Sequence, residues 1–187
     1  VFSSPEHFWK FAESDLAREI LDEPYKAGFG FKGIAFGEEG FRHFFATIPI
    51  ESIYDMRDIN VRVSNTRTME NIVRCLGSTP VVVQYTDLFA KFQEGSINAA
   101  EQPVMNYYSS RFYKVAPYMI LDGHTIGAMQ IVISSFVWDS LSEKQKTVLN
   151  EAGEYASKIC RAIQGDLEQD VMRKLSDEGV VFFEVRD

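Results

Sequence analysis

The chain has 187 residues, of which 45% are hydrophobic, enough for a packed core in one large domain or in two small lobes. Its 27 acidic residues outnumber its 19 basic residues, and the net charge of −8 argues against binding to nucleic acid or to an anionic membrane surface. The longest apolar run, near Ala128–Val132, is far shorter than the ~20 residues that a membrane-spanning helix needs.

The first third of the chain predicts short helices followed by strands. Ser3-Ser4-Pro5-Glu6 is typical of a helix start, with serine as N-cap and proline in the first turn. Apolar residues within 5–22 have the spacing of one or two short amphipathic helices. A strand is expected over Gly33–Phe36, and a polar turn separates it from the apolar stretch Gly40–Phe45. Ile59–Val63 alternates like a strand and turns Arg62 away from its valine neighbours.

Strands and helices alternate in the middle of the chain. Each expected helix has a capping residue or a proline at its start, and glycine ends two of them. The expected helices are Arg67–Leu76, Thr86–Glu94 and a third that starts at Pro103. The expected strands between them are Val81–Val83 and Ile97–Ala100. This alternation predicts an α/β fold with a largely parallel sheet.

The last part of the chain predicts one long helix. Ser142 and Gln145 form an S-x-x-Q capping box, and no proline follows until the chain ends, so a helix is expected over residues 143–178. At 1.5 Å per residue it would be about 50 Å long and would bridge or brace two lobes. Its predicted apolar stripe is Val148, Ala152, Ile159, Ile163, Leu167, Val171 and Leu175. Flanking strands are expected at Pro117–Leu121, at Ala128–Ser134 after Asp122-Gly123-His124, and at Val180–Val185.

Motifs of catalysis, metal binding and nucleotide binding are missing from the sequence. No G-x-S-x-G, H-E-x-x-H or P-loop pattern occurs, and the three histidines are not at ligand spacing. Cys75 and Cys160 are interpreted as two buried small hydrophobes, with a single disulfide as the alternative. The sequence therefore predicts no metal and no cofactor.

Arg42 and Arg62 are the candidates for an anion site. Each lies inside an otherwise apolar stretch, where a guanidinium held by a strand suits bidentate carboxylate recognition. An arginine in such a place can also snorkel to solvent or pair with a nearby acid. Arg62 is favoured because Ser64, Asn65 and the first amides of a helix follow it at the carboxyl end of a strand.

Several segments, taken together, resemble the solute-binding proteins of tripartite ATP-independent periplasmic (TRAP) transporters. Their order and spacing match over nearly the whole chain, and the expected long helix fits the same pattern. The segments are Gly40-Phe41-Arg42, Pro49-Ile50, Asp55-Met56, Val61-Arg62-Val63, Leu76–Pro80, Glu94–Pro103, His124 and Trp138–Ser142.

The resemblance implies roles for individual residues. Arg62 corresponds to the principal carboxylate-binding arginine and Arg42 to a supporting one. Asn65 and Tyr85 fall at ligand-contacting positions, although Tyr85 is equally consistent with an ordinary core aromatic. Glu101 and Gln102 occupy a segment that often reads Glu-Asn-Pro, so Gln102 is a departure, and a solvated or structurally paired acid is the favoured interpretation of Glu101. His124 is expected near the hinge as a hydrogen-bond partner between lobes.

The resemblance also implies a periplasmic-binding-protein-like α/β fold in which two lobes, joined by hinge strands and braced by the long helix, close over the ligand. Residues 40–126 would form the lobe with the arginines. Residues 1–39 and 127–187 would form part of the other lobe, the hinge and the long helix at about 143–178. The chain is expected to be an incomplete excerpt that lacks the start of the first lobe.

The implied function is that of a receptor. It would capture a small carboxylic or sugar acid and deliver it to the membrane subunits of a TRAP transporter, in the periplasm or another extracytoplasmic space. A signal peptide is expected in the full-length protein, and no catalysis, nucleic-acid partner or membrane insertion is expected. Two alternatives stay open: a ligand-sensing domain of the same fold in a signalling protein and, less favoured, an enzyme that acts on organic acids.

Overall fold

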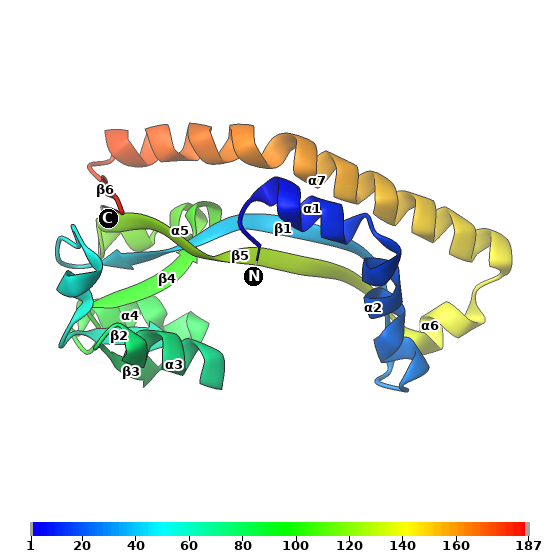
Figure 1. Cartoon of the computed structure of the whole chain (residues 1–187), viewed down its shortest axis with the longest axis horizontal. Coiled ribbons are helices and arrows are strands. Elements are labelled where there is room, and N and C mark those ends of the chain that lie inside the picture. The colour runs from blue at the N-terminus through cyan, green and yellow to red at the C-terminus, as the bar shows by residue number, and fades with distance from the viewer. Residues whose placement is uncertain (1, 186–187) are drawn as a thin grey trace. The chain divides into compact units, whose positions relative to one another are not determined.

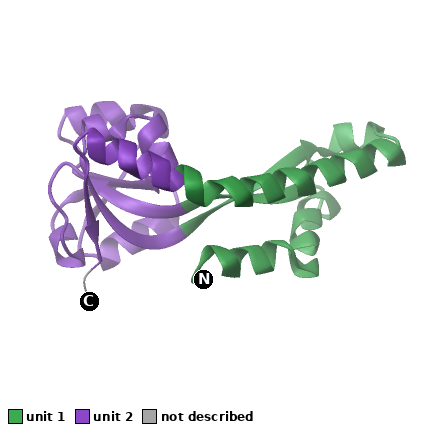
Figure 2. Cartoon of the chain, turned by 90° about the horizontal axis from the view of Figure 1, so that it is seen from above, with its two compact units in different colours: residues 1–40, 126–167 green, residues 41–125, 168–187 purple. Residues whose placement is uncertain are grey.

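The computed structural model describes residues 2–185, and contacts within the chain divide it into two compact units (Figure 2). Unit 1 holds the chain up to Gly40 together with Ile126–Leu167. Unit 2 holds Phe41–Thr125 and the chain from Glu168 onward. The division into lobes that the sequence predicts stays a prediction. It differs from these units at residues 168–185, which the sequence analysis groups with the first part of the long helix and which here belong to unit 2.

Unit 1 is built from helices together with the first part of one strand and the last part of another. Ser4 and Ser14 cap its first two helices, since their hydroxyl groups accept hydrogen bonds from His7 N and Ala17 N. A small core gathers Phe8, Trp9, Ala17, Leu21 and Phe36. Its elements, labelled in Figure 1, are α1 (Pro5–Ala12), α2 (Asp15–Lys26), α6 (Ser135–Ser140) and parts of β1 (Phe31–Ala46), β5 (Tyr118–Ser134) and α7 (Glu143–Asp177).

Unit 2 contains most of a six-stranded sheet in the order β3-β2-β4-β1-β5-β6. β2 (Asn60–Val63) is parallel to both β3 (Thr79–Val82) and β4 (Ala99–Pro103), and β6 (Val181–Glu184) is parallel to β5. β1 is antiparallel to β4, with Arg42 opposite Pro103 and Phe44 opposite Glu101. The sheet is therefore mixed, and the parallel pairs agree with the α/β pattern of the sequence. Its helices are α3 (Arg67–Cys75), α4 (Leu88–Gln93) and α5 (Val104–Ser109), with 3-10 turns at Ile53–Met56, Tyr85–Asp87 and Phe112–Lys114.

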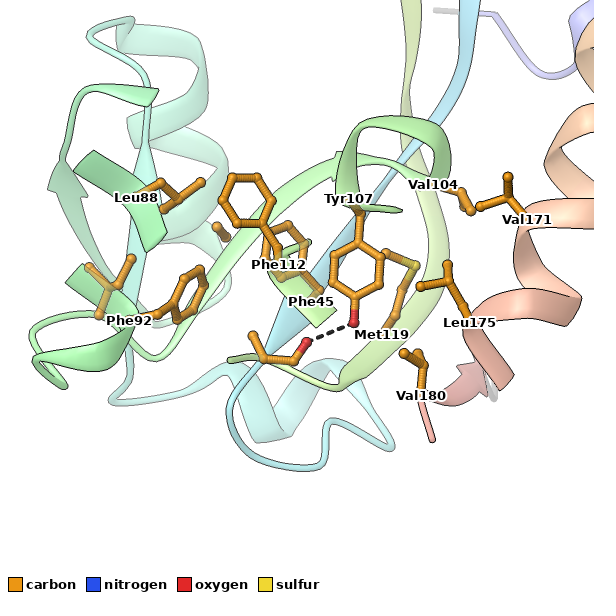
Figure 3. Packing of buried hydrophobic residues seen from close by; sticks show 13 residues of the cluster. Phe45, Leu88, Phe92, Val104, Tyr107, Phe112, Met119, Val171, Leu175 and Val180 are labelled. Carbon is orange, nitrogen blue, oxygen red and sulfur yellow. Dashed lines mark hydrogen bonds between the residues drawn. The ribbon is translucent and has the colours of Figure 1, made fainter. Parts of the chain in front are cut away.

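Two apolar clusters form the core of unit 2. In the larger one, Phe45 is fully buried and its ring lies 4.8 Å from that of Tyr107 and 5.6 Å from that of Phe112 (Figure 3). The Tyr107 hydroxyl donates to the Ala116 carbonyl at 2.8 Å, which satisfies the one polar atom of this aromatic side chain. The smaller cluster includes Phe44, Val61, Val63 and Ile120.

Three element predictions were wrong in detail. β1 runs without interruption through the expected polar turn, because its acidic residues are accommodated in the extended strand and Gly40 adopts φ +84. β5 likewise continues through Asp122-Gly123-His124, with Gly123 at φ +54. Thr86 does not cap a helix, because a 3-10 turn precedes α4, which begins at Leu88.

The long helix is confirmed, while its apolar stripe is not. α7 runs over Glu143–Asp177 behind the predicted capping box, in which Ser142 N donates to Gln145 Oε1 at 2.9 Å. Only Val171 and Leu175 of the stripe are buried large residues, whereas Val148, Ile159, Ile163 and Leu167 are exposed. No helix within residues 2–185 is long and apolar enough to cross a membrane.

Small side chains explain which side of α7 is buried in unit 1. A Cβ at Gly153 would lie 2.5 Å from Ile34 Cγ2, so the helix backbone closely approaches β1 at that point. Ser157 donates to the Phe36 carbonyl and Cys160 to the Glu38 carbonyl. The side of α7 that faces β1 therefore carries small and polar groups in place of the predicted stripe. Both cysteines are free and Cys75 is exposed, so neither the predicted pair of buried hydrophobes nor the disulfide is found.

Candidate functional site

Arg62 is a buried arginine on a central strand of unit 2. Its side chain is 6% exposed, and its neighbours Val61 and Val63 are fully buried. Nε donates to the Val83 carbonyl at 2.9 Å, which fixes the guanidinium beside the end of β3. Burial lowers the pKa of Arg62, and the like charge of Arg42 acts in the same direction, while Glu101 opposes them. Within the described residues no carboxylate forms an ion pair with Arg62, so its charge is left for another partner.

Arg42 is already engaged by an acid. It forms a bidentate pair with Glu101, from Nε to Oε2 and from Nη2 to Oε1 at 2.9 Å, and Nη2 also reaches the Glu101 carbonyl at 3.3 Å. The Glu101 side chain is only 3% exposed, so both charges are largely removed from water. The antiparallel register of β1 and β4 brings the pair together, because Phe44 stands opposite Glu101 and Arg42 precedes it by two residues on the same face.

His124 extends this pair into a longer charged cluster. Its Nδ1 lies 2.6 Å from Asp122 Oδ2, and its Nε2 lies 3.7 Å from Glu101 Oε2, too far for a hydrogen bond but close enough for a charge interaction. The ring stacks on Phe44 at 4.4 Å. Burial alone would lower the pKa of His124, but Asp122 and Glu101 outweigh it and raise that pKa to about 9. His124 is therefore an imidazolium at neutral pH.

The same interactions keep Glu101 ionised. Burial would raise the pKa of Glu101, but His124 and Arg42 together hold it below its usual range. We define the charged cluster as Arg42, Glu101, His124 and Asp122, in which the two negative and two positive charges alternate. Val61 pairs with Ala99, so Glu101 stands level with Val63, where the parallel strand β2 ends; the ends of such strands are where open α/β sheets bind ligands.

The other predicted residues are not members of this cluster. Asn65 is exposed in the connection between β2 and α3. Tyr85 is 44% exposed; its hydroxyl lies 2.6 Å from Ser110 Oγ, and its ring packs edge-on against Phe112 at 5.7 Å. Gln102 is buried, and side-chain alternation turns it to the face of β4 opposite Glu101. The ligand-contacting roles of these three residues stay predictions.

Two residues of the site were missed at the sequence level. Asp122 was read as part of a break between strands, although it precedes His124 by two residues and shares its face of β5. His43 is buried, its Nδ1 accepts a hydrogen bond from Gly123 N at 3.0 Å, and burial lowers its pKa. The D-x-H spacing on a strand was the signal that could have identified Asp122, had β5 been predicted as continuous.

The charged cluster coincides with no metal site among the described residues, and a cavity of unit 1 lies elsewhere. Residues 2–185 contain no group of three or more histidine, cysteine or acidic side chains arranged to hold a metal ion. A cavity of about 240 Å³ in unit 1 is lined by residues such as Trp9, Leu21, Ile34 and Phe36, and none of the predicted site residues lines it. The arrangement around Arg62 thus offers charge recognition.

The whole chain matches one family model, that of bacterial extracellular solute-binding proteins, family 7 (DctP), over residues 1–187. The chain belongs to this family. The resemblance to TRAP solute-binding proteins that was inferred from the sequence is thereby confirmed. The predicted periplasmic-binding-protein-like α/β fold agrees with the solved structures of relatives.

Among curated relatives of this DctP-family chain, a solute-binding protein of Chromohalobacter salexigens is 27% identical over 188 residues, covering 100% of this chain and 55% of the relative. An uncharacterized protein of Haemophilus influenzae is 26% identical, covering 98% of this chain and 56% of the relative. A crystal structure of a TRAP periplasmic solute binding protein from C. salexigens with bound D-glucuronate is 27% identical, with a TM-score of 0.92, covering 100% of this chain and 62% of that one. The chain thus spans little more than half the length of these curated relatives.

Proposed function

We propose that this chain is the part of a TRAP solute receptor that binds the ligand carboxylate, and that the receptor captures a small organic acid outside the cytoplasm for membrane transport subunits. The observation that carries the proposal is the unequal state of the two arginines. Arg42 is neutralised by Glu101, whereas Arg62 is buried, oriented by the Val83 carbonyl and without an acidic partner among the described residues.

The charge of Arg62 favours a carboxylate ligand over a neutral one. A guanidinium offers two parallel donors that match the two oxygens of a carboxylate, and the interaction is stronger where water is largely excluded. The net charge of −8 would repel an anion from the molecule as a whole, so capture depends on this local cation. The bound D-glucuronate of the C. salexigens relative makes sugar acids the first class to test.

The test begins with a thermal-shift screen of sugar acids, dicarboxylates and keto acids on the intact protein. A ligand at ~100 times its dissociation constant adds ~2.7 kcal/mol to the free energy of unfolding, which is readily seen as a higher melting temperature. Each acid that binds is also incubated with the protein and assayed for turnover. Unchanged acid after long incubation supports a receptor, whereas conversion would favour the enzyme alternative.

Arg62→Ala then tests the carboxylate contact by calorimetric titration. The variant is expected to lose about 2–5 kcal/mol of binding free energy, because the bound carboxylate loses its charge partner. Arg62→Lys should fall between wild type and Arg62→Ala, since it keeps the charge and loses the two parallel donors. Arg74→Ala is the matched control, because Arg74 is an exposed arginine of unit 2 paired with Glu70. Unchanged binding by folded Arg62→Ala would contradict the proposal.

A further inference from the structure

Asp122 contacts Phe44, His124 and His43, although the proposed function gives it no contact with the ligand. Its Oδ2 lies 2.6 Å from His124 Nδ1, and its Oδ1 accepts a hydrogen bond from the backbone of Phe44 at 3.1 Å. The same Oδ1 lies 3.8 Å from His43 Nδ1. The carboxylate is 14% exposed, so these contacts form largely away from water. Within the charged cluster, Asp122 therefore joins β1 to β5.

These contacts fix the orientation of the His124 ring. Asp122 binds both the Nδ1 of the ring and the backbone of Phe44, and the Phe44 ring in turn stacks on His124 with an interplanar angle of 23°. The imidazole is thus held at one edge and on one face. Its Nε2 is consequently directed toward Glu101, and it has no hydrogen-bond partner among the described residues.

The charge of His124 depends on the groups that face it. Asp122 lies on its own strand, Glu101 on β4, and Arg42, His43 and the Phe44 ring on β1. His43 has its pKa lowered by burial, so it is neutral at physiological pH and does not repel His124. If Asp122 lost its charge, burial would favour the neutral imidazole, and Glu101 would keep Arg42 as its only cationic partner.

We propose that Asp122 is a positioning residue of the acid-binding site: through a charged His124 it holds Glu101 and Arg42 in the paired arrangement that leaves Arg62 to receive the ligand carboxylate. This inference rests on the proposed function for the identity of the ligand. The arrangement of the four charged side chains does not depend on it. If this arrangement were lost, the Glu101 carboxylate would be free to turn toward Arg62 and to compete with the ligand carboxylate for the N–H donors of Arg62.

The first measurement needs no ligand. Asp122→Asn keeps an oxygen that can accept from Phe44 N and removes the negative charge. An NMR titration of the His124 imidazole in the intact protein is expected to show its pKa falling from about 9 to the normal histidine range. Asp122→Glu should keep most of the elevation, because it restores the charge. Asp139→Asn, which removes an exposed acid from unit 1, is the control and should leave His124 unchanged.

The second measurement uses an acid that the thermal-shift screen has identified. Asp122→Asn should bind it about tenfold more weakly than wild type near pH 8, which is the lower end of the loss seen when a carboxylate that orients a metal-binding histidine is removed. The affinity should recover near pH 6, where the imidazole is protonated again. Wild type should bind equally at both values. A lost affinity that is the same at both pH values would assign Asp122 a merely structural role and overturn the proposal.

The two proposals fail in different ways. If no acid binds wild type, the proposed function fails, while the titration still tests Asp122. If Asp122→Asn leaves the pKa of His124 elevated, the positioning role is wrong even when acids bind through Arg62. Should Asp122→Asn not fold, Asp122→Glu and His124→Gln carry the test. His124→Gln is expected to bind more weakly than wild type without any dependence on pH between about 6 and 8, and unchanged binding would overturn the role.

Discussion

The two units bury their apolar side chains very differently. Unit 2 has two clusters in which large residues such as Phe45, Tyr107 and Ile120 are almost fully buried. Unit 1 has one small cluster and leaves large apolar residues exposed on α7 and β5, among them Tyr155, Ile159, Ile163, Leu167, Met129, Ile131 and Val132. Unit 2 is therefore held together by its own core, whereas unit 1 depends more on close backbone approach and carries apolar surface of the kind that marks interaction sites.

Buried acids show the same contrast. In unit 2, Glu101 is paired with Arg42 and lies near His124, and its pKa is held low. In unit 1, burial raises the pKa of Glu38, and its Oε2 has no hydrogen-bond partner among the described residues. The buried acid of unit 2 thus has cationic partners, whereas the buried acid of unit 1 keeps an oxygen without a hydrogen-bond partner.

The largest effect expected from this comparison is that of a core truncation in unit 2. Phe45→Ala should lower the free energy of unfolding by about 3–5 kcal/mol, because it leaves a cavity between Tyr107 and Phe112. Ile159→Ala, an apolar truncation on the exposed side of α7, should change it by less than about 0.5 kcal/mol. Urea unfolding of the intact protein measures both. A large loss for Ile159→Ala would show that this side chain is covered and would break the comparison.

A smaller effect is expected from pH, acting on the charged cluster of unit 2. The folded pKa of His124, about 9, lies above its usual value of 6.5, so folding favours the protonated ring. The stabilisation is complete below about pH 6.5 and is lost as pH rises through about 9. We expect a loss on the order of 1–3 kcal/mol across this interval, seen in urea unfolding at a series of pH values.

His124→Gln is the control for this pH dependence. It should flatten the stability curve between about pH 6.5 and 9, because no group at position 124 then titrates. A variant that keeps the full wild-type slope would assign the effect to another group and separate the charged cluster from the stability of unit 2.

The smallest predicted effects concern two glycines of α7 in unit 1. Gly153→Ala should destabilise the protein by about 1 kcal/mol, because the new Cβ would lie 2.5 Å from Ile34 Cγ2 and 3.3 Å from Ala35 Cβ. Gly165→Ala should stabilise it by roughly 0.5–1 kcal/mol, since no atom lies within 4 Å of the new Cβ and alanine favours the helix. Equal effects in thermal unfolding would disprove the close approach of α7 to β1.

Local sequence signals were sufficient to predict helices whose ends carry a capping residue or a glycine. The capping box at Ser142 gave the start of α7, and glycines at φ near +80 and +72 follow α3 and α4 as expected. The prediction that Arg62 lies near the carboxyl end of a strand agrees with its place on β2, one residue before that strand ends, because alternation and strand ends are local properties. Continuity of β1 and β5 escaped prediction, since polar residues within a strand look like a turn until their partners are known.

The sequence by itself was enough to identify the family, the α/β alternation, the long helix and the two arginines as candidates for an anion site. Capping residues, periodicity and isolated charges are signals that act over a few positions. Only the tertiary structure decided how those arginines differ. Arg42 meets Glu101, which lies 59 residues away along the chain, through the register of β1 and β4, and Asp122 meets the backbone of Phe44 across 78 residues. Pairings of that range arise from strand register and burial, which no short stretch of sequence contains.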